Sequence, residues 1–196
     1  MTTLSDYLKT KGCDITEGHC GQVDEQRNDL LNITSQPNIK VMEIGFNAGH
    51  SAETFLINNP TLTLVSFDIG EHEYLYDGKN YIDMTFPGRH TLIIGDSTVS
   101  VPNYISNNPD VKFDVIFIDG GHDYQISRAD MANSITLAHN ETTIIMDDTT
   151  YTPGWAVSYT FGPTQVWNEF EHSGVVKSIC KRDYTVGRGM TWGHKL

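Results

Sequence analysis

Three aspartates and one histidine in the second half of the chain are of types that can bind a cation or transfer a proton, and they lie at or near the ends of two apolar runs. Asp119 ends an apolar run, Asp147 and Asp148 end the next one, and His122 follows Asp119 by three residues. Carboxylates that meet repel one another strongly unless a cation or protons intervene. Oxygen ligands of this kind suit Mg²⁺, Ca²⁺ or Mn²⁺, so one interpretation is a metal site formed by Asp119, Asp147 and Asp148. The alternative is a set of solvated acids that never converge.

His122 is the candidate general base beside these carboxylates. An imidazole has an unperturbed pKa of about 6.5, which suits proton abstraction near neutral pH. A cation held by the aspartates would lower the pKa of a nearby hydroxyl and so produce an oxygen nucleophile. We therefore predict Asp119 and His122 as catalytic residues. A histidine that only packs at the start of a helix is the alternative.

A second group of candidate residues lies earlier in the chain. A mostly apolar run at residues 39–44 meets the turn Gly45-Phe-Asn-Ala-Gly49, and a helical pattern begins at His50. Glycines in such a turn let backbone N–H groups approach a ligand, and the helix N-terminus favours anionic groups. Asp68 follows Gly49 by 19 residues (68 − 49), close to where a nucleotide-binding βαβ unit has its ribose-binding acid. A plain βα corner and a solvated aspartate are the alternatives.

The elements that must position these residues alternate along the chain. Short apolar runs predict five strands, at residues 39–44, 62–68, 91–94, 113–119 and 142–146. Helical patterns between them predict a doubly wound, Rossmann-like α/β fold with a mostly parallel sheet. In such sheets the ligand lies at the carboxyl ends of the strands. Those ends carry a glycine or acids: Gly45, Asp68, Asp96, Asp119, Asp147 and Asp148.

The last part of the chain predicts a different arrangement. Residues 175–181 and 188–195 indicate an antiparallel hairpin at one edge, which brings the sheet to seven strands. Residues 149–163 are rich in Thr, Tyr, Gly and aromatic residues. This composition is typical of a mobile loop that shapes a substrate pocket, and it is equally typical of an ordinary surface loop. Gln165 to His172 predicts a short helix.

Weaker helical patterns complete the chain. Residues 1–37 indicate two polar helical pieces, residues 70–89 a loop and a helix broken at Asp77-Gly78, and residues 101–108 a helix with a proline near its start. We predict one domain in three parts: an N-terminal helical cap at 1–37, a cofactor-binding core at 38–150, and a substrate loop with the C-terminal hairpin at 151–196.

The overall composition disfavours several classes of protein. Among 196 residues, 13 Lys and Arg face 25 Asp and Glu, a net charge of −12. That balance disfavours nucleic acid as a partner, because phosphate backbones bind basic faces. The apolar runs are too short for a membrane span, and the first residues have no signal-peptide pattern. Three cysteines without a secretory signal favour free thiols and a reducing, cytoplasmic setting.

Taken together, the motifs resemble those of class I S-adenosylmethionine-dependent methyltransferases. The resemblance is strongest to the divalent-metal-dependent O-methyltransferases, the group that contains catechol O-methyltransferase and antibiotic sugar O-methyltransferases. It covers residues 39–150 and rests on five motifs in order: Glu43-Ile-Gly-Phe-Asn-Ala-Gly-His-Ser51, Ser66-Phe-Asp68, Gly95-Asp-Ser97, Phe117-Ile-Asp-Gly-Gly-His-Asp-Tyr124 and Met146-Asp-Asp-Thr149.

The resemblance implies a set of residues that bind S-adenosylmethionine: Glu43, Gly45, Gly49, Ser51, Asp68, Asp96, Ser97 and Asp119. The first three would shape the methionine end, with Ser51 on its carboxylate. Asp68 would hold the ribose hydroxyls, and Asp96 and Ser97 would flank the adenine.

The resemblance also implies the acceptor chemistry. Asp119, Asp147 and Asp148 match the metal ligands of the family, with Mg²⁺ the expected ion, and His122 matches its general base. The implied reaction is O-methyl transfer to a small molecule such as a sugar or a catechol. The N-terminal segment and residues 150–172 match no motif of the family and are the segments expected to hold the substrate specificity, so the acceptor stays open.

Three alternatives stay open at this point. An NAD(P)-dependent oxidoreductase would use the same kind of sheet, although Gly-x-Gly-x-x-Gly and Tyr-x-x-x-Lys patterns are missing. A non-catalytic cofactor-binding protein would keep the pocket and lose the chemistry. The hairpin edge and the loop in the 150s could each make contacts between chains, so a homodimer is as open as a monomer.

Overall fold

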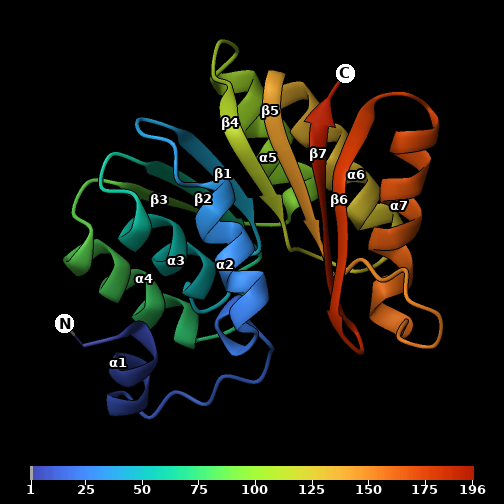
Figure 1. Cartoon of the computed structure of the whole chain (residues 1–196). Coiled ribbons are helices and arrows are strands. Elements are labelled where there is room, and N and C mark those ends of the chain that lie inside the picture. Colours follow the sequence, from blue (N-terminus) through green and yellow to red (C-terminus); the bar gives the residue numbers. More distant parts are fainter. Residues whose placement is uncertain (1) are drawn as a thin grey trace.

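The computed structural model describes residues 2–196, which form a seven-stranded sheet with helices on both faces (Figure 1). The strands are β1 (Lys40–Ile44), β2 (Thr63–Asp68), β3 (His90–Ile94), β4 (Phe113–Ile118), β5 (Ala138–Asp147), β6 (Val176–Thr185) and β7 (Arg188–Lys195). Their order is β3-β2-β1-β4-β5-β7-β6. Strand β7 runs antiparallel to both of its neighbours, whereas the other neighbouring pairs are parallel. The predicted α/β sheet with a C-terminal antiparallel hairpin is confirmed.

Seven helices and two 3₁₀ turns connect and cover the strands within the described residues. They are α1 (Leu4–Thr10), η1 (Cys20–Gln22), α2 (Asp24–Ile33), α3 (His50–Asn58), α4 (Tyr74–Thr85), α5 (Ser97–Asn107), α6 (Tyr124–Leu137), η2 (Ser158–Thr160) and α7 (Phe161–His172). Helices α1 to α4 pack on one face of the sheet and α5 to α7 on the other. In residues 2–196, no helix combines the length and the apolarity that a bilayer crossing requires.

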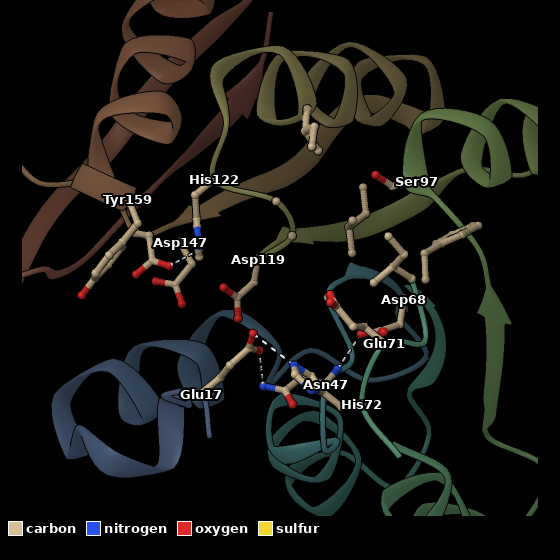
Figure 2. Close-up of a pocket in the computed structure, with 18 of the residues that line it drawn as sticks. Glu17, Asn47, Asp68, Glu71, His72, Ser97, Asp119, His122, Asp147 and Tyr159 are labelled. Carbon is tan, nitrogen blue, oxygen red and sulfur yellow. Dashed lines mark hydrogen bonds and ion pairs between the residues drawn. The ribbon is translucent and has the colours of Figure 1, made fainter. Parts of the chain in front are cut away.

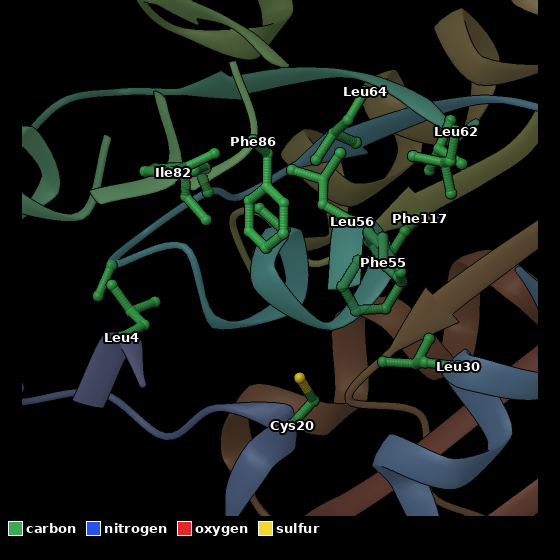
Figure 3. Close-up of a cluster of buried hydrophobic side chains, with 14 of the residues drawn as sticks. Leu4, Cys20, Leu30, Phe55, Leu56, Leu62, Leu64, Ile82, Phe86 and Phe117 are labelled. Atoms are coloured by element: carbon green, nitrogen blue, oxygen red, sulfur yellow. The ribbon is translucent and has the colours of Figure 1, made fainter. Parts of the chain in front are cut away.

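The central strands are apolar on both faces because helices cover both faces. In β4, Val115 and Phe117 belong to the buried cluster under α1 to α4, whereas Ile116 and Ile118 pack toward α5 to α7. Figure 3 shows the first cluster, in which the rings of Phe117 and Phe55 meet edge to face at 5.8 Å. A one-residue slip would turn every one of these side chains to the wrong face, so burial fixes where β4 ends.

Three predicted helix boundaries were wrong. Helix α7 begins at Phe161, four residues before the predicted Gln165 and inside the segment predicted as a loop. Helix α4 continues through Gly78. A Cβ at this position would overlap the carbonyl oxygen of Ala48, so the glycine permits a close backbone contact and does not end the helix. Helix α5 begins at Ser97, four residues earlier than predicted. The reason is a cap: the Asp96 carboxylate accepts a hydrogen bond from the Thr98 N–H at 2.9 Å.

The N-terminal segment crosses the sheet at the edge where the site lies. Helix α1 packs beside α4 and α2 packs beside α3 (Figure 1). The backbone N–H of Leu4 donates to Glu53 at 2.9 Å, and the Tyr81 hydroxyl donates to the Thr2 carbonyl at 2.8 Å. Residues 13–19, which we call the strap, connect α1 to η1 and α2.

Candidate active site

The carboxyl ends of the parallel strands border one cavity of about 570 Å³ (Figure 2). Eight of the predicted site residues line it: Gly45, Asp68, Asp96, Ser97, Asp119, His122, Asp147 and Asp148. They come from distant parts of the sequence and meet because parallel strands end at the same edge of a sheet. Figure 2 shows Ser97 and Asp68 toward one end of this cavity and His122 and Tyr159 toward the other.

The corner after β1 requires glycine. Gly45 has a φ of +99°, and its N–H donates to the Phe67 carbonyl at 2.8 Å. The Asp119 N–H donates to the Ile44 carbonyl, also at 2.8 Å. These bonds hold the ends of β2 and β4 against the corner so closely that a Cβ on Gly45 would overlap the carbonyl oxygen of Asp119. Residue 45 therefore has to lack a side chain, and its backbone borders the cavity.

Asp68, the last residue of β2, is oriented by backbone donors. One of its oxygens accepts from the Asn47 N–H at 2.7 Å and the other from the Gly70 N–H at 2.8 Å. A carboxylate offers about four acceptor positions, so about two remain for hydroxyl groups in the cavity. The exposed side chain of Ile69 adds an apolar surface next to it.

Three residues predicted for the methionine end do not line the cavity. Glu43 and Ser51 are buried, and the hydroxyl groups of Ser51 and Ser66 donate to Glu43, the second at 2.6 Å. Gly49 caps α3, and a Cβ there would lie 2.8 Å from the ring of Phe46. A buried carboxylate needs donors, and Ser51 supplies one. The structure thus gives the Ser51 hydroxyl a partner inside the protein, the Glu43 carboxylate.

Replacing Glu43 by glutamine is expected to remove a pH dependence of folding stability. Burial raises the pKa of Glu43 from 4.5 to about 7, although the two serine hydroxyls oppose part of the rise. Because the folded-state pKa is the higher one, this group's contribution is fully present below its unfolded pKa and is lost as the pH rises to about 7, a change of about 3 kcal/mol. Urea unfolding across this pH range should show a decline that is smaller in Glu43→Gln than in the wild type by about 3 kcal/mol, because Asp119 and Asp147, whose pKa values are also raised, still contribute to the decline in both proteins. Declines of equal size in the two proteins would contradict this role of Glu43.

Asp119, His122 and Asp148 converge at the other end of the cavity. One donor atom from each lies within 4.8 Å of the other two, and His122 Nε2 is 2.8 Å from Asp148 Oδ2. Asp148 has a φ of +54°, a left-handed conformation that aspartate tolerates better than most residues. This turn comes directly after β5, and both Asp147 and Asp148 border the cavity.

Asp147 lies beside this group, but its carboxylate has a different partner. Gln26 Nε2 donates to both of its oxygens, at 2.7 and 2.8 Å, and Gln26 Oε1 accepts from Arg188 Nη2 at 2.9 Å. Gln26 is fully buried, and Asp147 is 6% exposed. The sequence predicted Asp147 as a metal ligand with Asp119 and Asp148. In the structure the third donor that converges with those two carboxylates is His122.

The electrostatics of this end favour bound protons or a bound cation. Burial, together with the charges of Asp147 and Asp148, raises the pKa of Asp119 well above its usual value. Burial and Asp148 likewise raise the pKa of Asp147 to about 7. The hydrogen bond to Asp148 raises the pKa of His122. Arg188 offsets part of the rise for Asp119 and Asp147, and a cation would relieve the same repulsion.

Several cavity residues carry no sequence motif. Glu17 and His19 belong to the strap, and Arg188 begins β7. The aromatic loop predicted at 149–163 contributes Tyr159, whose ring lies 5.4 Å from that of His122. The loop is tied to the hairpin through Gly187, whose N–H donates to the Trp155 carbonyl at 2.8 Å. In the sequence, the composition of residues 149–163 indicated that this loop would supply a pocket residue such as Tyr159. No sequence pattern indicated Glu17 or His19 of the strap.

The sheet order and the strand-end site define the class I methyltransferase fold. A family model described as a methyltransferase domain matches residues 42–149, more than half of the chain, and the chain belongs to that family. The prediction of a methyltransferase is therefore confirmed, and an oxidoreductase finds no support. No match was found among curated protein sequences.

Solved structures share this architecture at low sequence identity. An O-methyltransferase from Bacillus cereus in complex with S-adenosylhomocysteine has a TM-score of 0.73 and 17% identity, over 98% of this chain and 90% of that chain. The O-methyltransferase TomG from Streptomyces achromogenes, in complex with S-adenosylmethionine, has a TM-score of 0.74 and 13% identity, over 98% of this chain and 87% of that chain. A TDP-rhamnose 3'-O-methyltransferase of calicheamicin biosynthesis has a TM-score of 0.63 and 17% identity, over 85% of this chain and 76% of that chain. At these identities the likeness establishes the fold alone.

Proposed function

We propose that this methyltransferase transfers a methyl group from S-adenosylmethionine to a hydroxyl of a small molecule, assisted by a divalent cation. The observation that carries the proposal is one continuous cavity, with Gly45 and Asp68 on its wall and the His122–Asp148 pair on the same wall. A donor and an acceptor can therefore meet in one cavity. The Bacillus cereus and Streptomyces achromogenes proteins, described with S-adenosylhomocysteine and S-adenosylmethionine, support this donor.

The residues at the donor end fit S-adenosylmethionine. The cavity of about 570 Å³ lies in the usual range for small-molecule sites, roughly 300–1,000 Å³. Gly45 leaves the corner free, and Asp68 keeps acceptor positions for ribose hydroxyls. Asp96 and Ser97 would flank the adenine. When bound, S-adenosylmethionine supplies a methyl group on a positively charged sulfur, so the chain has to align an oxygen nucleophile and remove its proton.

His122 would remove that proton. Asp148 accepts a hydrogen bond from Nε2 and holds the ring, which leaves Nδ1 to take the proton of the acceptor hydroxyl. The Asp148 carboxylate then stabilises the imidazolium that forms. The ring of Tyr159, beside His122, would give the acceptor an aromatic wall.

Asp119 and Asp148 would hold the divalent cation, with Mg²⁺ the expected ion. Their oxygens fit one cation because they and a nitrogen of His122 lie within 4.8 Å of one another. Burial and the charges of Asp147 and Asp148 raise the pKa of Asp119, and a cation at this place would relieve the repulsion among the carboxylates. The chemistry supplied by a cation at this place is a lower pKa of a coordinated hydroxyl.

Exhaustive chelation is expected to abolish methyl transfer and to leave the binding of S-adenosylhomocysteine unchanged. The physical reason is that the cation ligands serve the acceptor, whereas Gly45 and Asp68 serve the donor. Initial rates with a labelled donor and calorimetric titrations, each before chelation, after it and after Mg²⁺ is added back, would measure both effects. Turnover that survives metal removal would contradict the cation's role and leave deprotonation to His122.

Methyl-labelled S-adenosylmethionine, incubated with the protein and a panel of sugars, catechols and phenols, tests the activity. Sugars come first in the panel because one protein of the same fold acts on TDP-rhamnose. Label that enters an acceptor with the wild type, and not with His122→Ala, would support the proposal. A protein that binds neither S-adenosylmethionine nor S-adenosylhomocysteine would overturn it.

A further inference from the structure

One stretch of the cavity wall has no role in the transfer described above. Glu17, Gly18 and His19 of the strap line the cavity together with Gly45 and Asn47. Gly18 packs against the Arg188 guanidinium so closely that a Cβ there would overlap it. The strap thus forms part of the enclosure of the site, in addition to joining α1 to α2.

Contacts on two sides hold the strap in this position. Glu17 Oε2 accepts a hydrogen bond from Asn47 Nδ2 at 2.9 Å, and Oε1 lies 3.3 Å from His72 Nε2. The imidazole of His19 stacks on that of His50, with 3.6 Å between the ring centroids. Figure 2 shows Glu17 entering the cavity on the side of Asn47 and His72. The Glu17 side chain is 58% exposed, so a ligand can reach its carboxylate.

Glu17 is connected through Asn47 to Asp68, the carboxylate proposed to hold the ribose. Asn47 links two carboxylates, because its backbone N–H donates to Asp68 at 2.7 Å and its side chain donates to Glu17. A ribose held by Asp68 and a sulfur directed toward His122 leave the tail to run over Gly45 and Asn47. That tail carries an ammonium group and a carboxylate, and Glu17 offers the charge that an ammonium group needs.

We propose that Glu17 binds the α-ammonium group of S-adenosylmethionine and so makes the strap part of the donor site. The inference rests on the proposed donor. A carboxylate offers about four acceptor positions, and Asn47 and His72 use two, so an ammonium group can be added without displacing either. Charge-assisted hydrogen bonds of this kind are about twice as strong as neutral ones.

The test is a calorimetric comparison of two ligands, S-adenosylhomocysteine and an analogue in which hydrogen replaces its amino group. Glu17→Gln keeps the size of the side chain and the acceptor for Asn47, and removes the charge. This variant is expected to bind S-adenosylhomocysteine about 10- to 100-fold more weakly and the analogue as tightly as the wild type does. The matched control is Glu71→Gln, which removes one negative charge from the same cavity wall and should preserve the wild-type preference between the ligands.

The possible outcomes separate this inference from the proposed function. Equal weakening of both ligands by Glu17→Gln, or no weakening of either, would overturn the role of Glu17 while the donor site stands. The same loss of preference in Glu71→Gln would overturn it too, since net charge would then account for the effect. A wild type that binds neither ligand would overturn the proposed donor, and the role of Glu17 with it.

Discussion

Replacing His122 by alanine is expected to lower kcat for methyl transfer by about 10²- to 10⁴-fold, the usual contribution of a general base. The affinity for S-adenosylhomocysteine should stay within about a factor of two, because the variant removes a group that acts on the acceptor. In the structure, His122 Nε2 lies 2.8 Å from Asp148 Oδ2, and His122 borders the cavity beside Tyr159. Rates at saturating donor, together with titration of the purified variant, would measure the two effects separately.

The matched control for this prediction is a second histidine–aspartate pair. His139 Nε2 lies 3.1 Å from Asp114 Oδ1, a geometry close to that of the His122 pair, and neither residue lines the cavity. His139→Ala should leave kcat unchanged. If His122→Ala lowered kcat and donor affinity by the same factor, His122 would be a structural histidine, and the proposed base would have to be sought elsewhere.

Replacing Gly45 by alanine is expected to destabilise the fold by about 2–5 kcal/mol. About 1–2 kcal/mol comes from placing an L-residue at a left-handed φ, here +99°. The rest comes from steric overlap, since a Cβ would meet the carbonyl oxygen of Asp119 and force β1 and β4 apart, at a cost of about 1–3 kcal/mol. The loss should appear as a lower denaturant midpoint, and the variant that remains folded should bind S-adenosylhomocysteine poorly because the corner has moved.

Gly154 provides the control that separates the two contributions. Its φ is +81°, and a Cβ there would have no atom within 4 Å. Gly154→Ala should therefore cost only the backbone strain, about 1–2 kcal/mol. If both alanine variants lost the same stability, the close approach of Asp119 to the corner would contribute nothing, and the steric account of Gly45 would be wrong.

The sequence by itself determined the sheet and the edge at which the site lies. Central strands such as β1 and β4 are largely buried on both faces, so they appear as mostly apolar runs that are followed by a glycine or an aspartate. Parallel strands connected by helices all end on one edge, and the residues after those runs must therefore lie near one another. This reasoning needs only local patterns, which explains why it brought Gly45, Asp68 and Asp119 to the same cavity.

Only the tertiary structure decided what each side chain in that region contacts. Gln26 donates a hydrogen bond to Asp147 across 121 residues of sequence, and Ser51 donates one to the buried Glu43, so each of these predicted ligands has a partner inside the protein that no motif indicates. Likewise, nothing local marks Glu17 as a cavity residue, because its position depends on how α1 and α2 pack against α4 and α3. Such contacts join segments far apart in the chain, and their geometry follows from packing and from the need of buried polar groups for partners.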